Sequence, residues 1–117
     1  MTRKTFAMRA AAILTTSEVL STAYPLAKST DDRSVMVEIA FTLGSLDIAG
    51  FNFYVSTSEG GTYVPLAIEG GATSLSLDAT GNIAVRVDAP GYSHLKVGAI
   101  GYGTATSSSA TITARYV

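Results

Sequence analysis

Apolar and polar residues alternate strictly over residues 33–43 of the chain. The apolar residue recurs at every second position, as Val35, Val37, Ile39, Phe41 and Leu43. Successive side chains of a β-strand point to opposite faces, so this spacing places all five on one face of a strand, and no helix could gather them. The pattern therefore predicts a strand with one buried face.

Shorter alternating segments fill the rest of the chain and are separated by breaks rich in Gly, Asp and Ser. The strands predicted from them cover residues 10–16, 18–28, 51–56, 62–66, 74–78, 83–87, 95–99 and 110–116. Proline cannot donate a hydrogen bond to a β-ladder. Segment 18–28 is therefore expected to be an edge strand or to break at Pro25, and segment 62–66 to be cut by Pro65.

The spacing of these segments predicts the fold class. About eight strands recur every 8 to 12 residues with no helical segment between them, which is typical of an all-β protein with a single antiparallel β-sandwich, jelly-roll-like, over residues 10–117. The sequence Ser58-Glu59-Gly60-Gly61 predicts a hairpin whose paired glycines supply positive φ angles. Residues 1–9 show no clear period and are expected to form an extended N-terminal arm.

The composition is low in charge. Charged residues make up 15% of the 117 residues and hydrophobic residues 47%, against about 25% charged in typical soluble domains. This shortage indicates a surface that is partly covered by protein contacts, although a small β-domain with solvated Ser and Thr faces gives the same composition. A chain of this length fits one domain.

The charge balance excludes some partners. With a net charge of −1, the chain offers no basic field for a nucleic-acid backbone, which needs several Lys or Arg on one surface. The apolar run from Ala10 to Leu14 is shorter than the core of a signal peptide, and no segment approaches the roughly 20 apolar residues of a membrane span. We therefore expect no nucleic-acid or membrane partner and synthesis in the cytoplasm.

No group of residues in the sequence discloses a chemistry. There is no cysteine, and the single histidine, His94, cannot build a zinc site alone. The acidic residues are dispersed, whereas calcium prefers several oxygen ligands from one loop. The serines at 107–109 lack the strand-to-helix turn that exposes a nucleophile. We therefore expect no catalytic residue, no metal, no cofactor and no enzymatic activity.

The tyrosines leave two interpretations open. Exposed aromatic rings on a β-sandwich can stack on sugar rings, and Tyr92, Tyr102 and the loop Gly101–Ser109 could form such a surface. Tyrosine equally supplies contact area at protein interfaces while its hydroxyl stays polar. The absence of tryptophan from the sequence favours the second interpretation.

Three stretches resemble a known class of protein. They are residues 37–56, the hairpin Ser56–Leu66, and Gly81–Val97 through Pro90-Gly91-Tyr92. Together they resemble small structural proteins of tailed-phage virion gene clusters, particularly the capsid decoration (cement) proteins with a β-sandwich or jelly-roll body. The resemblance covers roughly residues 10–117 and rests on strand and turn style; Tyr63 departs from it, because a bulkier Trp is expected nearby.

The resemblance implies a non-enzymatic protein on the exterior of the virion capsid. Such a protein bridges neighbouring capsid subunits, so the implied partners are the major capsid protein and further copies of the chain in a homodimer or homotrimer. We expect the sandwich to associate through an apolar-rich face or edge, and the arm to lie on a capsid subunit through apolar burial and ion pairs. The residues expected at these contacts are Arg3, Lys4, Phe6, Met8, Arg9, Tyr92 and Tyr102.

Two alternatives to capsid decoration stay open at this point. The first is a carbohydrate-binding or host-adhesion module that uses the tyrosine surface. The second is a tail or neck component of the virion, which would share the fold and the interfaces.

Overall fold

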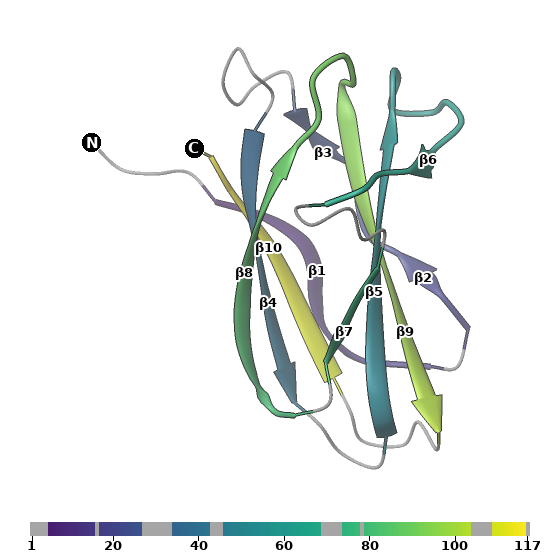
Figure 1. The fold of residues 1–117 in the computed structure, drawn as a ribbon, viewed down its shortest axis with the longest axis vertical. Helices are drawn as coiled ribbons and strands as arrows, with labels where there is room; N and C mark the ends of the chain where they lie inside the picture. Colours follow the sequence, from purple (N-terminus) through teal and green to yellow (C-terminus); the bar gives the residue numbers. More distant parts are fainter. Residues whose placement is uncertain are drawn as a thin grey trace.

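A computed structural model describes residues 5–15, 17–26, 34–42, 46–68, 74–77, 79–103 and 109–116; for 11–13, 34, 46–48, 102–103 and 115–116 it describes the backbone alone. These residues form ten β-strands and no α-helix, so they include no helix long and apolar enough to cross a membrane. The molecule measures 41 × 34 × 26 Å, and its strands lie in two facing sheets (Figure 1).

Sheet A has four antiparallel strands. In spatial order they are β1 (Thr5–Ile13), β10 (Ser109–Tyr116), β4 (Ser34–Thr42) and β8 (Gly81–Asp88). Strands β1 and β8 are therefore its two edges. β4 pairs with β10 from Val35 to Thr42 and with β8 from Ser34 to Phe41.

Sheet B is built around the long central pair β5 and β9. Its strands are β2 (Val19–Leu20), β3 (Tyr24–Pro25), β9 (His94–Gly103), β5 (Leu46–Ser56), β6 (Val64–Pro65) and β7 (Ser74–Leu77). β2 and β3 pair in succession along the outer side of β9, and β6 and β7 along the outer side of β5. Each short pair thus acts as one interrupted edge strand.

The order of the strands is that of a jelly roll. When β2/β3 and β6/β7 are each counted as one interrupted strand, eight strands remain, and they lie as first, eighth, third and sixth in sheet A and second, seventh, fourth and fifth in sheet B. This double-sheet arrangement is the jelly roll. The prediction of an all-β, jelly-roll-like sandwich of about eight strands is confirmed.

The core fills the space between the sheets and follows the alternation in the sequence. On β4, Val35, Val37, Ile39 and Phe41 are at most 2% exposed. Facing them from β5 is Phe51, whose ring meets that of Phe41 edge to face with centroids 6.3 Å apart. Such an edge-to-face contact adds to the apolar burial that holds the sheets together.

The expected boundary between an arm and the sandwich at residue 9 is wrong. β1 begins at Thr5 and pairs with β10 from Thr5↔Arg115 onward. Met8 is 2% exposed in the core, and the ring of Phe6 packs edge to face on that of Tyr24, 5.4 Å away. Residues 5–9 are held by the sheet and the core, because their backbone pairs with β10 and the side chains of Phe6 and Met8 pack against the core.

The turn chemistry also differs from the expectation. Gly91 (φ 89°) is the one glycine with positive φ in the described part of the chain, and it follows Pro90 in a turn closed by the Tyr92 N–H to the Ala89 carbonyl at 3.2 Å. At the predicted hairpin, Gly61 takes part in the turn without a positive φ. Its N–H donates to the Ser58 carbonyl at 3.2 Å, and a Cβ atom at this position would meet the Ser58 hydroxyl, which would have to turn aside.

Candidate interaction surfaces

The residues expected to contact partners do not gather at one place. Met8 is buried and Phe6 is half-buried against the core, so neither can anchor the chain on a neighbouring subunit while it stays in the fold. Tyr92 is half-buried and packs against the same core. Arg3, Lys4, the side chain of Tyr102 and loop residues 104–108 lie outside the described residues.

Arg9 serves the sheet in which it lies. Its Nε donates to the carbonyl of Ala110 at 3.2 Å, beside a register irregularity between β1 and β10. Partial burial of the guanidinium lowers the pKa of Arg9 from its ordinary value. The side chain therefore supports an irregular stretch of the ladder.

The described residues show no constellation of reactive groups. No three of the His, Asp and Glu side chains among them come together as metal ligands, and each buried side-chain nitrogen or oxygen they contain has a hydrogen-bond partner. His94 Nδ1 lies 2.8 Å from the hydroxyl of Ser93.

The outer face of sheet B carries a polar cluster that we call the Glu18 cluster: Glu18, Asn52 and Tyr54. The Glu18 carboxylate accepts hydrogen bonds from the Asn52 amide and from the Tyr54 hydroxyl, the latter at 2.9 and 3.0 Å to its two oxygens. Burial raises the pKa of Tyr54, and the hydrogen bond and the negative charge of Glu18 raise it further. The cluster ties the segment before β2 to strand β5, two strands away.

A glycine makes room for this contact. A Cβ atom at Gly98, on β9 between Glu18 and β5, would lie 2.6 Å from the Glu18 carboxyl carbon. The carboxylate crosses β9 at this position because there is no side chain to stop it.

A second polar contact lies beside the first. Lys96 Nζ sits 4.6 Å from the centroid of the Tyr63 ring, within the range of a cation–π interaction, and the Tyr63 hydroxyl donates to the Glu59 carbonyl at 2.8 Å. Burial, and then the charge of Glu59, raise the pKa of Tyr63. The polar groups of this face are thus largely engaged with one another.

Three of the four sheet edges are interrupted. Strand β1 has two register irregularities against β10. The β2/β3 edge is interrupted at Ser21, where the Ser21 N–H donates to the Val97 carbonyl and the Val97 N–H donates to the Ser21 hydroxyl instead of a carbonyl, both at 2.9 Å, and it ends in Pro25. The β6/β7 edge contains Pro65 and breaks between Pro65 and Ser74.

The fourth edge, β8, is continuous. It pairs with β4 through eight consecutive residue pairs, from Ser34↔Asp88 to Phe41↔Gly81, without a register shift. Its sequence holds neither proline nor lysine. Interruptions, prolines and charged side chains, lysine above all, are devices by which proteins prevent an edge strand from pairing with another chain; of these β8 has only the charges of Arg86 and Asp88, which lie in an ion pair with each other.

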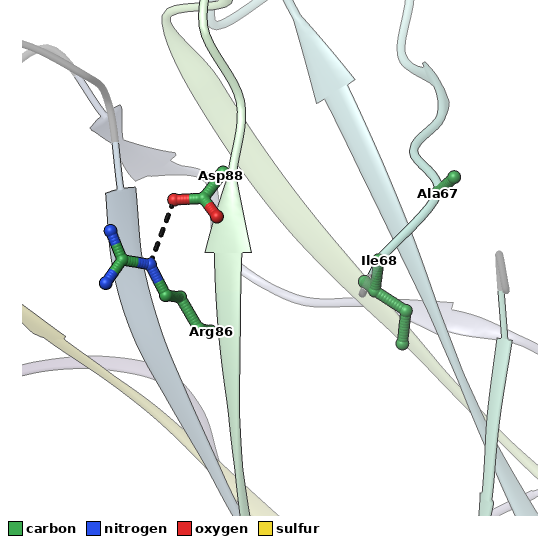
Figure 2. A pocket seen from close by; sticks show the side chains of 4 residues that line it. All are labelled: Ala67, Ile68, Arg86 and Asp88. Carbon is green, nitrogen blue, oxygen red and sulfur yellow. Dashed lines mark hydrogen bonds and ion pairs between the residues drawn. The ribbon is translucent and has the colours of Figure 1, made fainter. Parts of the chain in front are cut away.

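A shallow cleft of about 410 Å³ flanks this edge. Ala67 and Ile68, from the segment after β6, line one side, and Arg86 and Asp88 of β8 line the other. Figure 2 shows the two β8 side chains joined by an ion pair, in which Arg86 Nε lies 3.1 Å from Asp88 Oδ1. The cleft has no cluster of acids or nucleophiles in the described structure.

Sequence reasoning missed both the Glu18 cluster and the special status of β8. Glu18 and Tyr54 are 36 positions apart, and nothing in their local sequence indicates that they meet. The alternation of residues 83–87 predicts the strand but not its place at an edge. The absence of proline and lysine there was the available signal, and it gains meaning only with the strand order.

Comparisons with known proteins support the fold. No protein-family model matches the chain, and no curated protein matches it. The chain is similar to the crystal structure of the SPBc2 prophage-derived protein YomS, with a TM-score of 0.64 and 17% identity over 98% of this chain and 92% of that one. It is also similar to a chain of the Bacillus endospore appendages, described as a family of disulfide-linked pili, with a TM-score of 0.55 and 12% identity over 99% and 87%. These similarities are to chains of matching extent and show a shared fold.

Proposed function

We propose that this protein is a non-enzymatic structural protein of a phage virion, which binds the outside of the capsid and bridges neighbouring capsid subunits. The observation that carries the proposal is the end-to-end match to a prophage-derived protein, in which each chain is covered by more than nine-tenths. The resemblance of the hairpin and of Gly81–Val97 to decoration proteins points the same way.

The physical character of the described surface agrees with this role. The sandwich offers an uninterrupted strand edge at β8, which suits contact with other protein subunits. The second similar structure belongs to a pilus, whose subunits are joined by disulfides. The present sequence contains no cysteine, so its residues cannot form disulfides. The contacts that they make with other subunits are held by packing and hydrogen bonds.

The carbohydrate-binding alternative is expected at Tyr92, Tyr102 and the loop Gly101–Ser109, of which Tyr92 is half-buried against the core. The polar face of sheet B offers no better surface for it. The Tyr54 hydroxyl and the Asn52 amide are engaged with Glu18, and the Lys96 ammonium lies over the Tyr63 ring. A sugar would have to displace these internal contacts before it could stack or form hydrogen bonds there. Titration with cell-wall polysaccharide tests this alternative, and we expect no saturable binding.

The proposal is tested on particles of the phage that encodes the chain. Quantitative mass spectrometry should find hundreds of copies per particle, and electron cryomicroscopy should place them on the outer surface of the head. A few to a dozen copies would instead indicate a tail or neck component and contradict capsid decoration. Absence from purified particles would contradict a structural role in the virion altogether.

A further inference from the structure

The continuous edge of β8 presents both an apolar and a polar row to a neighbouring strand. Ile83 and Val85 point toward the core but stay half-buried, whereas Val87 is 1% exposed. On the other face, Asn82, Ala84, Arg86 and Asp88 are exposed. Because β8 is the last strand of sheet A, alternate backbone N–H and C=O groups point away from β4. A further strand would extend the sheet and cover the two half-buried side chains.

We propose that the strand that pairs with β8 is β8 of a second copy of this chain, antiparallel to the first and related to it by a twofold axis at Val85. In this register Val85 lies opposite its own symmetry mate, and Ile83 lies opposite Val87 of the second copy. Every inward-pointing β-branched residue of the strand thus meets another β-branched residue, the kind of cross-strand pair that stabilises sheets.

The outward face of the same register opposes no like charges. Asn82 lies opposite Asp88 of the second copy, so an amide faces a carboxylate, and Arg86 lies opposite Ala84. A twofold axis at Arg86 would set two arginines against each other, and one at Val87 would set Pro90 opposite Ala84. An axis at Ala84 would set Val87 opposite Gly81 and lose an apolar pair. The axis at Val85 avoids all three defects.

A second copy is the occupant that the strand itself specifies. A twofold contact requires one surface to be complementary to itself, and the residues of β8 meet this requirement without any other chain. The pairing would join two four-stranded sheets A into one continuous sheet. The inference names one partner for a protein with the proposed structural role, and in this respect it rests on the proposed function.

The test compares two alanines on the two edge strands of sheet A. Ala84 of β8 and Ala7 of β1 are both exposed, so lysine at either position should leave the fold intact. Ala84→Lys places a lysine opposite Arg86 of the second copy, twice per dimer. Directly opposed like charges destabilise a strand pair, so we expect sedimentation equilibrium to show wild type and Ala7→Lys as dimers and Ala84→Lys with about tenfold weaker dimerisation.

The charge-reversed variant tests the register. Because Ala84 pairs with Glu38 of β4, this test is made in a Glu38→Gln background. There Ala84→Glu places a carboxylate opposite Arg86 of the second copy and opposes no like charge within its own sheet, so dimerisation should be at least as strong as in Glu38→Gln alone. With the axis at Ala84, the two glutamates would oppose each other and dimerisation would weaken. Weaker dimerisation of Ala84→Glu in the Glu38→Gln background therefore overturns the register, while circular dichroism of each variant reports that it is folded.

Two outcomes overturn the interface itself: a wild-type protein that remains monomeric to hundreds of micromolar, and an Ala84→Lys variant that dimerises like Ala7→Lys. These outcomes are separate from those of the virion test. A monomer found in hundreds of copies on the head would leave the proposed function standing without this interface. A dimer that depends on β8 but is absent from particles would leave this interface standing and contradict the proposed function.

Discussion

The β8 edge and the β2/β3 edge belong to the same sandwich, yet they are built in opposite ways. β8 runs for eight residues in continuous register with β4. The β2/β3 edge has two strands of two residues each, a serine hydroxyl in place of a backbone carbonyl and a proline at its end. In addition, the Glu18 carboxylate clamps the start of this edge onto β5.

The difference shows how a small β-protein can direct its own association. An edge strand offers unpaired backbone groups to any extended chain, so a sandwich with four regular edges could associate in several ways. Interrupting three edges and leaving one continuous restricts backbone pairing to one side of one sheet. The interruptions of the other three edges thus determine where the chain associates, and the side chains of β8 determine which partner strand fits there.

The largest expected effect comes from removing the core contact on which both edges depend. Phe51→Ala deletes the ring that meets Phe41 across the two sheets and leaves a cavity, so we expect the free energy of unfolding to fall by about 3–5 kcal/mol. Chemical denaturation measures this loss. Tyr63→Ala, which removes a ring from the outer face, should cost about 1 kcal/mol or less; equal losses would show that the two sheets do not share the core described.

A smaller effect is expected from Ser21→Ala, which attacks the interruption of the β2/β3 edge. The Val97 N–H would lose the hydroxyl to which it donates and stay buried without a partner, at a cost of about 1–3 kcal/mol. Denaturation midpoints give the loss, and amide exchange should accelerate at Val97. The matched variant Ser76→Ala, on the exposed face of β7, should change neither. An unchanged Ser21→Ala protein would contradict a structural role for the hydroxyl.

The smallest effect concerns the Glu18 cluster and is read from tyrosine ionisation. Glu18→Gln keeps a hydrogen-bond acceptor but removes the charge, so the pKa of Tyr54 should fall while burial, its first cause, still keeps it raised. A folded-state pKa above the unfolded value of about 10 contributes stability below that pH, and this contribution is lost as the pH rises through the folded pKa. The variant should therefore lose less stability in alkali than wild type.

NMR titration of the tyrosine rings separates this effect from a general one. Glu59→Gln provides the control, because the charge of Glu59 raises the pKa of Tyr63. It should move the titration of Tyr63 and leave that of Tyr54 in place. A Glu18→Gln variant in which Tyr54 titrates as in wild type would show that the carboxylate does not hold this edge in solution.

The sequence predicted the parts of the fold that depend on local alternation. Apolar and polar residues alternate without interruption over residues 35–41, and these residues lie in β4. The alternation corresponds to the structure because both neighbours, β10 and β8, pair with β4 in regular register. Interrupted edges were predicted less well. The pairing of β1 with β10 has two register irregularities and the sequence around Met8 shows no clear period, so the sequence alone predicts an arm where this strand begins.

The sequence predicts the interaction surfaces less well than the fold, and the reason is physical. Residues such as Phe6 and Met8, apolar in a segment without clear period, fit an exposed anchor and a buried strand equally well until the pairing with β10 is known. The formation of the Glu18 cluster depends on the position along β9 at which the segment before β2 lies. That position is set by tertiary pairing and not by any neighbour in the sequence.

Hydrogen–deuterium exchange of the backbone amides at several protein concentrations tests the central claim most directly. If β8 pairs with a second copy, its amides should exchange more slowly as the concentration rises, while those of β1, on the other edge of the same sheet, should not change. Exchange in β8 that is independent of concentration, or protection that appears at β1 instead, would contradict the account.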